Sequence, residues 1–292
     1  MACSKIFSGD LPELIYEIVR YFRNDYKMLY SCILVNRLWC RLTIPLLWED
    51  PFSIAVEDCN YYYLNESYEL KNYDFIGTYL YNLNDEDKTK LNEYGIDNNV
   101  FPLNTLFNYP SFIKCLNTQN LSFSIEEWIN NVGTITNDER SPISPNQNPL
   151  FDQNNILLSR FIILSLIKIF IDNEVNLYTF ELEITKYLNL SLKINPNDLV
   201  TFFKNSRNTF IKKLLIRNKM LDDSDDILPI IKEYLMKEKR IDYLAIEEVF
   251  LDKREELFSL KDEVKEFELY NIKVLCYDDL DIQVYEFVKE MD

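Results

Sequence analysis

The 292-residue chain carries 48 acidic and 31 basic side chains, which gives it a formal net charge of -17. Because nucleic-acid affinity depends largely on Lys and Arg, this balance argues against a nucleic-acid partner. The sequence contains no histidine, which excludes Ser-His-Asp and Cys-His catalysis and any zinc site that uses histidine.

The first predicted elements are three short helices near the N-terminus. In the first, apolar residues recur at the i, i+3, i+4, i+7 spacing of one helical face: Leu11, Leu14, Ile15, Ile18 and Phe22. Asp10 is placed to cap this helix, and Pro12 suits its first turn. Helical segments are expected to follow at 26–35 and 36–44, with Pro45 ending the last one. A core this small is expected to need cover from a partner or from the rest of the chain.

This stretch, LPELIYEIVRYFRNDYKMLYSCILVNRLWCRLTIPLLW, resembles the F-box family. The resemblance rests on an ordered pattern: Leu-Pro-x-x-hydrophobic, a helix of regular apolar spacing, Val-Asn-Arg-x-Trp and a closing Trp. The positions that carry it are Leu11, Pro12, Leu14, Ile18, Val35, Trp39 and Trp48. It covers residues 11–48 and leaves most of the chain outside the match.

The resemblance implies a substrate-receptor subunit of a Skp-cullin-F-box ubiquitin ligase, which is not an enzyme and needs no cofactor. It implies a Skp-type adaptor as the direct partner, a cullin bound through that adaptor, and a protein substrate. The implied adaptor-binding residues are Leu11, Pro12, Leu14, Ile15, Ile18, Val35 and Trp39. The implied core residues of the box are Phe22, Leu38, Leu42 and Trp48. The alternative is that the apolar face of the first helix packs against the C-terminal part of its own chain.

The middle of the chain is expected to be mostly helical between residues 53 and 135, as a region that follows an F-box at 1–52. Residues 136–155 are rich in Pro, Asn and Ser and predict a flexible loop. The apolar run at 156–171 contains Arg160 and Lys168 and is shorter than the ~20 residues of a membrane span. We therefore expect a buried helix there and no membrane partner.

Beyond this run, the spacing hydrophobic-x-x-hydrophobic-x-hydrophobic occurs four times. Its positions are Leu177, Phe180 and Leu182; Ile211, Leu214 and Ile216; Ile241, Leu244 and Ile246; and Val264, Phe267 and Leu269. Helical segments alternate with these predicted strands, which favours a parallel sheet. The spacing also resembles a degenerate leucine-rich repeat. The predicted fold is thus α/β and helix-rich: a three-helix F-box, then an irregular leucine-rich-repeat-like α/β solenoid at 156–292. Its expected substrate-binding residues are Tyr178, Glu181, Lys213 and Tyr243.

The acidic stretch LDDSDDILP at 221–229 could in principle bind a divalent metal. Pro229 instead favours a helix start there, capped by Asp225 or Asp226, so no metal site is expected. The sequence lacks the glycine-rich phosphate-binding and G-x-S-x-G patterns. Two alternatives stay open: an interaction scaffold outside the ligase, and a hydrolase using carboxylates at 222–226. The 6 cysteines lack CxxC spacing and the N-terminus lacks a signal-peptide pattern, so the cytoplasm or nucleus is the expected location.

Overall fold

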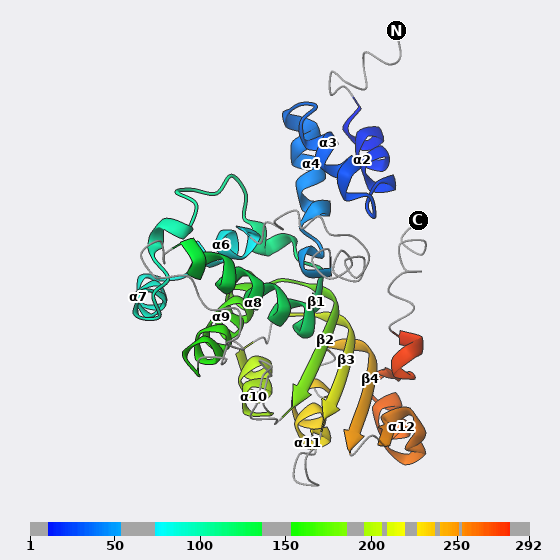
Figure 1. Cartoon of the computed structure of the whole chain (residues 1–292). Helices are drawn as coiled ribbons and strands as arrows, with labels where there is room; N and C mark the ends of the chain where they lie inside the picture. The colour runs from blue at the N-terminus through cyan, green and yellow to red at the C-terminus, as the bar shows by residue number, and fades with distance from the viewer. Residues whose placement is uncertain are drawn as a thin grey trace, which may run out of the picture.

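The computed structural model describes residues 11–53, 74–135, 153–185, 196–205, 209–219, 227–236, 240–250 and 253–280 (Figure 1). A three-helix module at the N-terminal end projects from a larger body that contains a sheet. The module consists of α2 (Pro12–Tyr21), α3 (Tyr26–Ile33) and α4 (Arg37–Leu47). The three predicted helices are therefore confirmed, with boundaries shifted by one to three residues.

The module has a small hydrophobic core of its own. It consists of Ile15, Val19, Leu29, Cys32, Trp39 and Leu46. The predicted core residues Phe22, Leu38 and Leu42 pack against it. Asp25 caps α3, and Asn36 caps α4 by accepting hydrogen bonds from two backbone N–H groups. Asp10, the expected cap of α2, lies outside the described residues, and the cap position of that helix is occupied by Leu11 without a side-chain bond.

Helix α4 continues past Pro45, so the expectation that this proline ends the helix is wrong. Proline removes one intrahelical hydrogen bond and is disfavoured inside a helix. The helix nevertheless closes its next turn, because the Trp48 N–H donates to the Ile44 carbonyl at 3.1 Å. Burial of Leu46 in the small core holds the residue after the proline in helical position. Tertiary packing thus outweighs the local preference of the proline.

Helices make up most of the body before the long strands begin. They are α6 (Asp74–Leu80), α7 (Asp85–Glu93), α8 (Thr118–Ile135) and α9 (Gln153–Asp172), with short turns η1 (Asn98–Val100) and η2 (Tyr109–Phe112). The expected loop at 136–155 lies outside the described residues up to position 152, and α9 already begins at Gln153. Within the described ranges, no helix has the length and apolar content that a membrane span requires.

The sheet contains four parallel strands in chain order. These are β1 (Cys115–Asn117), β2 (Leu177–Thr185), β3 (Ile211–Lys219) and β4 (Ile241–Phe250). Beyond β4 lie two short strands, the antiparallel β5 (Lys253–Glu256) and the parallel β6 (Lys273–Val274). The connecting segments contain α10 (Pro196–Asn205), α11 (Leu228–Ile231), the π-helical turn η4 (Lys232–Met236), η5 (Leu257–Ser259) and α12 (Lys261–Glu268). Helices between neighbouring parallel strands are the connections such a sheet needs.

Three of the four predicted apolar phrases are strands, and they lie in register. Leu177, Ile211 and Ile241 are neighbours across β2, β3 and β4, and so are Phe180, Leu214 and Leu244. These side chains face the helices and belong to the main core. The fourth phrase is wrong as a strand, because Val264 and Phe267 lie in helix α12. A spacing of three apolar positions fits a helix face as well as a strand start.

One main hydrophobic core extends from Phe52 in the N-terminal third to Val274 in β6. Residues of both the predicted helical region at 53–135 and the predicted repeat region contribute to it. Helix α9 runs through this core, with Ile162 and Leu166 fully buried, which confirms the buried helix expected at 156–171. Figure 1 shows α8, α9 and α10 gathered on one side of the strands, away from the C-terminal end of the described chain.

Candidate interaction surfaces

The N-terminal module exposes apolar side chains at the start of α2 and at the end of α3. Leu11 and Leu14 are 43% and 44% exposed, and Pro12 between them is also exposed. Val35, between α3 and α4, is 43% exposed. A surface made of such side chains is suited to a second apolar surface, because covering them removes hydrocarbon from water. We call Leu11, Pro12 and Leu14, which are adjacent at the start of α2, the module ridge.

The other predicted adaptor-binding residues have a different position. Ile15 and Trp39 are buried in the small core, and Ile18 packs against it with partial exposure. They therefore contribute to the core of the module rather than to its exposed surface. The alternative placed the apolar face of α2 against the C-terminal part of the chain. In the structure Leu11, Pro12 and Leu14 are exposed, and Ile15 is buried in the module's own core.

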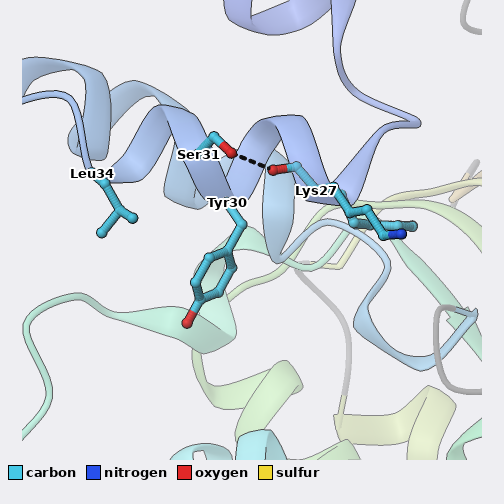
Figure 2. A pocket seen from close by; sticks show the side chains of 5 residues that line it. Lys27, Tyr30, Ser31 and Leu34 are labelled. Carbon is cyan, nitrogen blue, oxygen red and sulfur yellow. Dashed lines mark hydrogen bonds between the residues drawn. The ribbon is translucent and has the colours of Figure 1, made fainter.

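Helix α3 adds a second exposed apolar group that the sequence analysis did not single out. A shallow, open hollow of about 380 Å³ lies against this helix, lined by Tyr26, Lys27, Tyr30, Ser31 and Leu34. Figure 2 shows Tyr30 and Leu34 pointing toward the same side of the helix. They are 64% and 77% exposed. The i, i+4, i+8 spacing of Tyr26, Tyr30 and Leu34 was the signal that marks this outer face.

Trp48 does not belong to the core of the module, contrary to prediction. Its indole packs against Tyr79 and Tyr109, with ring centroids 5.2 and 4.2 Å away, at the edge of the main core. The reason is its place directly after α4, where the chain leaves the module and enters the body. Trp48 therefore anchors the module to the body.

A polar junction lies beside this anchor. The Arg23 guanidinium, in the turn after α2, donates to the Glu49 carboxylate with Nε 2.6 Å from Oε2. The Glu49 carbonyl accepts backbone hydrogen bonds from Lys114 and Cys115 at 2.8 and 3.0 Å, which joins the module to the start of β1. Burial raises the pKa of the Glu49 carboxyl group, while the charge of Arg23 acts in the opposite direction. The junction fixes the module on the body through both side chain and backbone.

The face of the sheet that points away from the main core carries three of the four predicted substrate-binding residues, Glu181, Lys213 and Tyr243. We call it the second face; it includes Glu181, Lys213, Leu215, Arg217, Tyr243, Ala245 and Glu247. Lys213 is only 4% exposed, and Tyr243 is partly buried. The Tyr178 ring lies 4.9 Å from the Lys212 ammonium and 5.4 Å from that of Lys213. These contacts are cation–π interactions.

The second face is not an open surface, because a C-terminal segment covers part of it. Tyr277 and Leu280 are buried against Leu215 and Ala245. The Tyr277 hydroxyl donates to the Glu181 carboxylate at 2.6 Å. The predicted substrate-binding residues Glu181, Lys213 and Tyr243 therefore do not lie on an open surface. Positions between the charged ones are apolar in β3 and β4, and an apolar patch at the centre of a sheet requires cover.

Charged side chains surround this covered patch. Glu247 is 2% exposed and accepts a hydrogen bond from Arg217 at 2.6 Å, and the Arg254 guanidinium lies 3.4 Å from its other oxygen. The Arg217 guanidinium also lies 4.5 Å from the centre of the Tyr277 ring. A buried carboxylate with two guanidinium partners keeps its charge balanced in a site of low polarity.

The acidic stretch at 222–226 lies outside the described residues. The cap position of α11 is Ile227, with Pro229 in the first turn, so the expected cap at Asp225 or Asp226 is wrong. Among the residues that the structure does describe, no group of three His, Cys, Asp or Glu side chains is arranged to bind a metal ion.

Comparisons with known proteins give no match: no family model, no curated protein and no solved structure is similar to this chain. The geometry of the two surfaces is therefore the basis for a functional proposal.

Proposed function

We propose that this chain is the substrate-recognition subunit of a Skp-cullin-F-box ubiquitin ligase. In this role the module ridge binds a Skp-type adaptor and, through it, a cullin, while the sheet-containing body binds a protein client. The proposal rests on the F-box-like sequence pattern together with one structural observation. Leu11, Pro12 and Leu14, the residues that begin the pattern, are exposed on a compact module that stands apart from the body.

The apolar side chains of the ridge are a source of binding energy. Fully burying an aliphatic side chain contributes on the order of 1.5 to 3 kcal/mol, so a few such residues supply much of a binding energy without charged contacts. The buried Ile15 and Trp39 hold the ridge in a fixed shape. A preformed ridge loses little conformational entropy on binding. The client-binding region would be the α/β body, with its leucine-rich-repeat-like sequence spacing.

Binding of the purified full-length chain to a purified Skp-type adaptor tests the proposal by calorimetry. The variant Leu11→Ala/Leu14→Ala removes two half-exposed apolar side chains without touching the small core. We expect it to weaken binding by about 2 kcal/mol, which is roughly thirtyfold in Kd. The matched control is Leu103→Ala/Leu106→Ala, which removes two leucines of the body that are 99% and 86% exposed.

Equal binding of both double variants would overturn the assignment of the ridge. Absence of adaptor binding by the wild-type chain would overturn the ligase proposal itself. Co-purification with the adaptor but not with a cullin would favour the alternative, an interaction protein that works outside the ligase.

A further inference from the structure

The segment Leu275–Leu280, which we call the strap, packs on the second face in the way that a bound peptide would. It follows β6 at the edge of the sheet and crosses toward β3 and β4. Figure 1 shows the end of the described chain, in red, beside β4 and away from α8, α9 and α10. The strap is held by its own set of contacts, separate from the main core.

The strap backbone is anchored at its first residues. The Leu275 N–H donates to the Leu244 carbonyl at 3.0 Å, which continues the pairing of β6 with β4. The Glu256 carboxylate accepts from the Tyr277 N–H at 3.3 Å and from the Cys276 thiol at 3.3 Å. These contacts set the position at which the following residues reach the second face.

A single helical turn at 277–280 then presents two side chains to the sheet. Tyr277 and Leu280 are three positions apart and point inward, with exposures of 2% and 0%, while Asp278 and Asp279 between them are exposed. Residues three apart lie on the same side of a helical turn. The recognised pattern is therefore Tyr-x-x-Leu with acidic residues in the intervening positions.

The sheet residues that contact Tyr277 and Leu280 form a binding site with both apolar and charged groups. Its floor consists of Leu215 and Ala245, both fully buried. The Arg217 guanidinium lies over the tyrosine ring, and the Glu181 carboxylate, which also accepts a hydrogen bond from Asn117, accepts from the tyrosine hydroxyl. A carboxylate at the hydroxyl position requires a hydrogen-bond donor there. It repels a phosphate group, so the site selects unmodified tyrosine.

We propose that the second face is a peptide-recognition site for client segments of the form Tyr-x-x-Leu with unmodified tyrosine, and that the strap occupies it within the chain until a client displaces it. That the displacing segment belongs to a client rests on the proposed function. The preference for Tyr-x-x-Leu rests only on the contacts between the strap and the second face. An intramolecular ligand acts at an effective concentration on the order of millimolar, so only a client with appreciable affinity or several contacts displaces the strap. The strap thereby restricts the site to specific clients.

Fluorescence anisotropy with the full-length chain tests this inference directly. The probe is a fluorescein-labelled peptide with the sequence of residues 273–280, with serine in place of Cys276 and an amidated C-terminus. We expect the strap variant Tyr277→Ala/Leu280→Ala to bind this peptide at least tenfold more tightly than wild type, because its own strap no longer competes. A peptide phosphorylated on its tyrosine is expected to lose at least tenfold in affinity for the same variant.

Two further variants keep the test decisive. Tyr277→Phe removes only the hydroxyl bond to Glu181 and is expected to raise peptide affinity severalfold even if the double variant folds poorly. In the strap-variant background, Arg217→Ala is expected to weaken peptide binding at least fivefold. The matched control is Arg254→Ala. Arg254 also pairs with Glu247, but its own side chain is 68% exposed, so we expect this variant to change the peptide Kd by less than twofold.

Folded strap variants that bind the peptide no better than wild type would overturn the inference, as would equal binding of the phosphorylated peptide. Peptide binding requires no adaptor, and adaptor binding by the module ridge requires no strap. Failure of this inference with intact adaptor binding is therefore distinct from failure of the proposed function.

Discussion

Tyr79 lies at the centre of the aromatic cluster that joins the module to the body. It is fully buried, and its ring contacts Trp48, Phe52 and Phe170 at centroid distances of 5.2, 6.0 and 5.2 Å. Its hydroxyl group has no hydrogen-bond partner within the part of the chain that the structure describes. An unsatisfied buried hydroxyl costs about 1–3 kcal/mol. The ring thus stabilises the fold while the hydroxyl opposes it.

We therefore expect Tyr79→Phe to raise the free energy of unfolding by about 1 kcal/mol, measured by urea denaturation. Tyr21→Phe, at a tyrosine that is 87% exposed, serves as control and should change nothing. A loss of stability in Tyr79→Phe would show that the hydroxyl has a favourable partner after all.

The same hydroxyl makes the free energy of unfolding depend on pH in the alkaline range. Burial raises the pKa of Tyr79 well above its ordinary value, and the Asp50 carboxylate adds to this effect. Because the unfolded chain releases the phenol proton at about pH 10 and the folded chain retains it, stability is fully present below pH 10 and falls as the pH rises above it. We expect this fall to be shallower in Tyr79→Phe, as measured by urea denaturation between pH 8 and 11.

At the scale of elements, α4 connects two cores. Trp39, near its start, belongs to the small core, and Trp48, just after its end, packs on the main core. We expect Trp48→Ala to lower the free energy of unfolding of the body by about 3 kcal/mol, at the low end for buried Trp because Trp48 is only partly buried. Trp39→Ala should destabilise the module instead.

Hydrogen exchange with mass spectrometry distinguishes the two variants. In Trp48→Ala, faster exchange is expected in peptides that cover β3, whereas in Trp39→Ala it is expected first in peptides that cover α2. If the two variants gave the reverse pattern, the assignment of the tryptophans to separate cores would be wrong.

The strands that could be predicted from sequence are the long ones. β2, β3 and β4 carry repeated apolar phrases because their core-facing side chains alternate over nine or ten residues. β1 escaped prediction because it has only three residues and a single buried side chain. β5 escaped because its sequence, KREE, is entirely charged and its pairing depends on β4. Short strands are specified by their neighbours rather than by their own pattern.

The same distinction applies to the candidate surfaces. The module ridge followed from local helical periodicity, which places Leu11 and Leu14 on one side of α2. The segment that covers the second face could not be predicted in this way, because its contacts join Tyr277 to Glu181 and Leu215, which are far away in the sequence. Sequence pattern alone shows that a strand has two faces. It does not show which distant segment packs on the second one.

At the scale of the whole molecule, the chain has a net charge of -17, so that acidic side chains outnumber basic ones and repel one another. Self-repulsion of this kind destabilises the folded state and is screened by salt. We expect the melting temperature to rise between 20 and 300 mM NaCl by roughly 2–4 °C, corresponding to about 1 kcal/mol. Calorimetry measures this change, with the same ionic strength from KCl as control. A fall with salt would mean that ion pairs such as Arg23 with Glu49 outweigh the repulsion.

The two backbone hydrogen bonds that the Glu49 carbonyl accepts have a consequence for the orientation of the module relative to the sheet. Since the backbone N–H groups of Lys114 and Cys115 both donate to it, the residue that leaves the module after α4 is attached to the start of β1 at two points. In the proposed complex, this double attachment is expected to restrict rotation of the module about Glu49, so that an adaptor on α2 and a client on the sheet keep a similar relative orientation from one complex to the next.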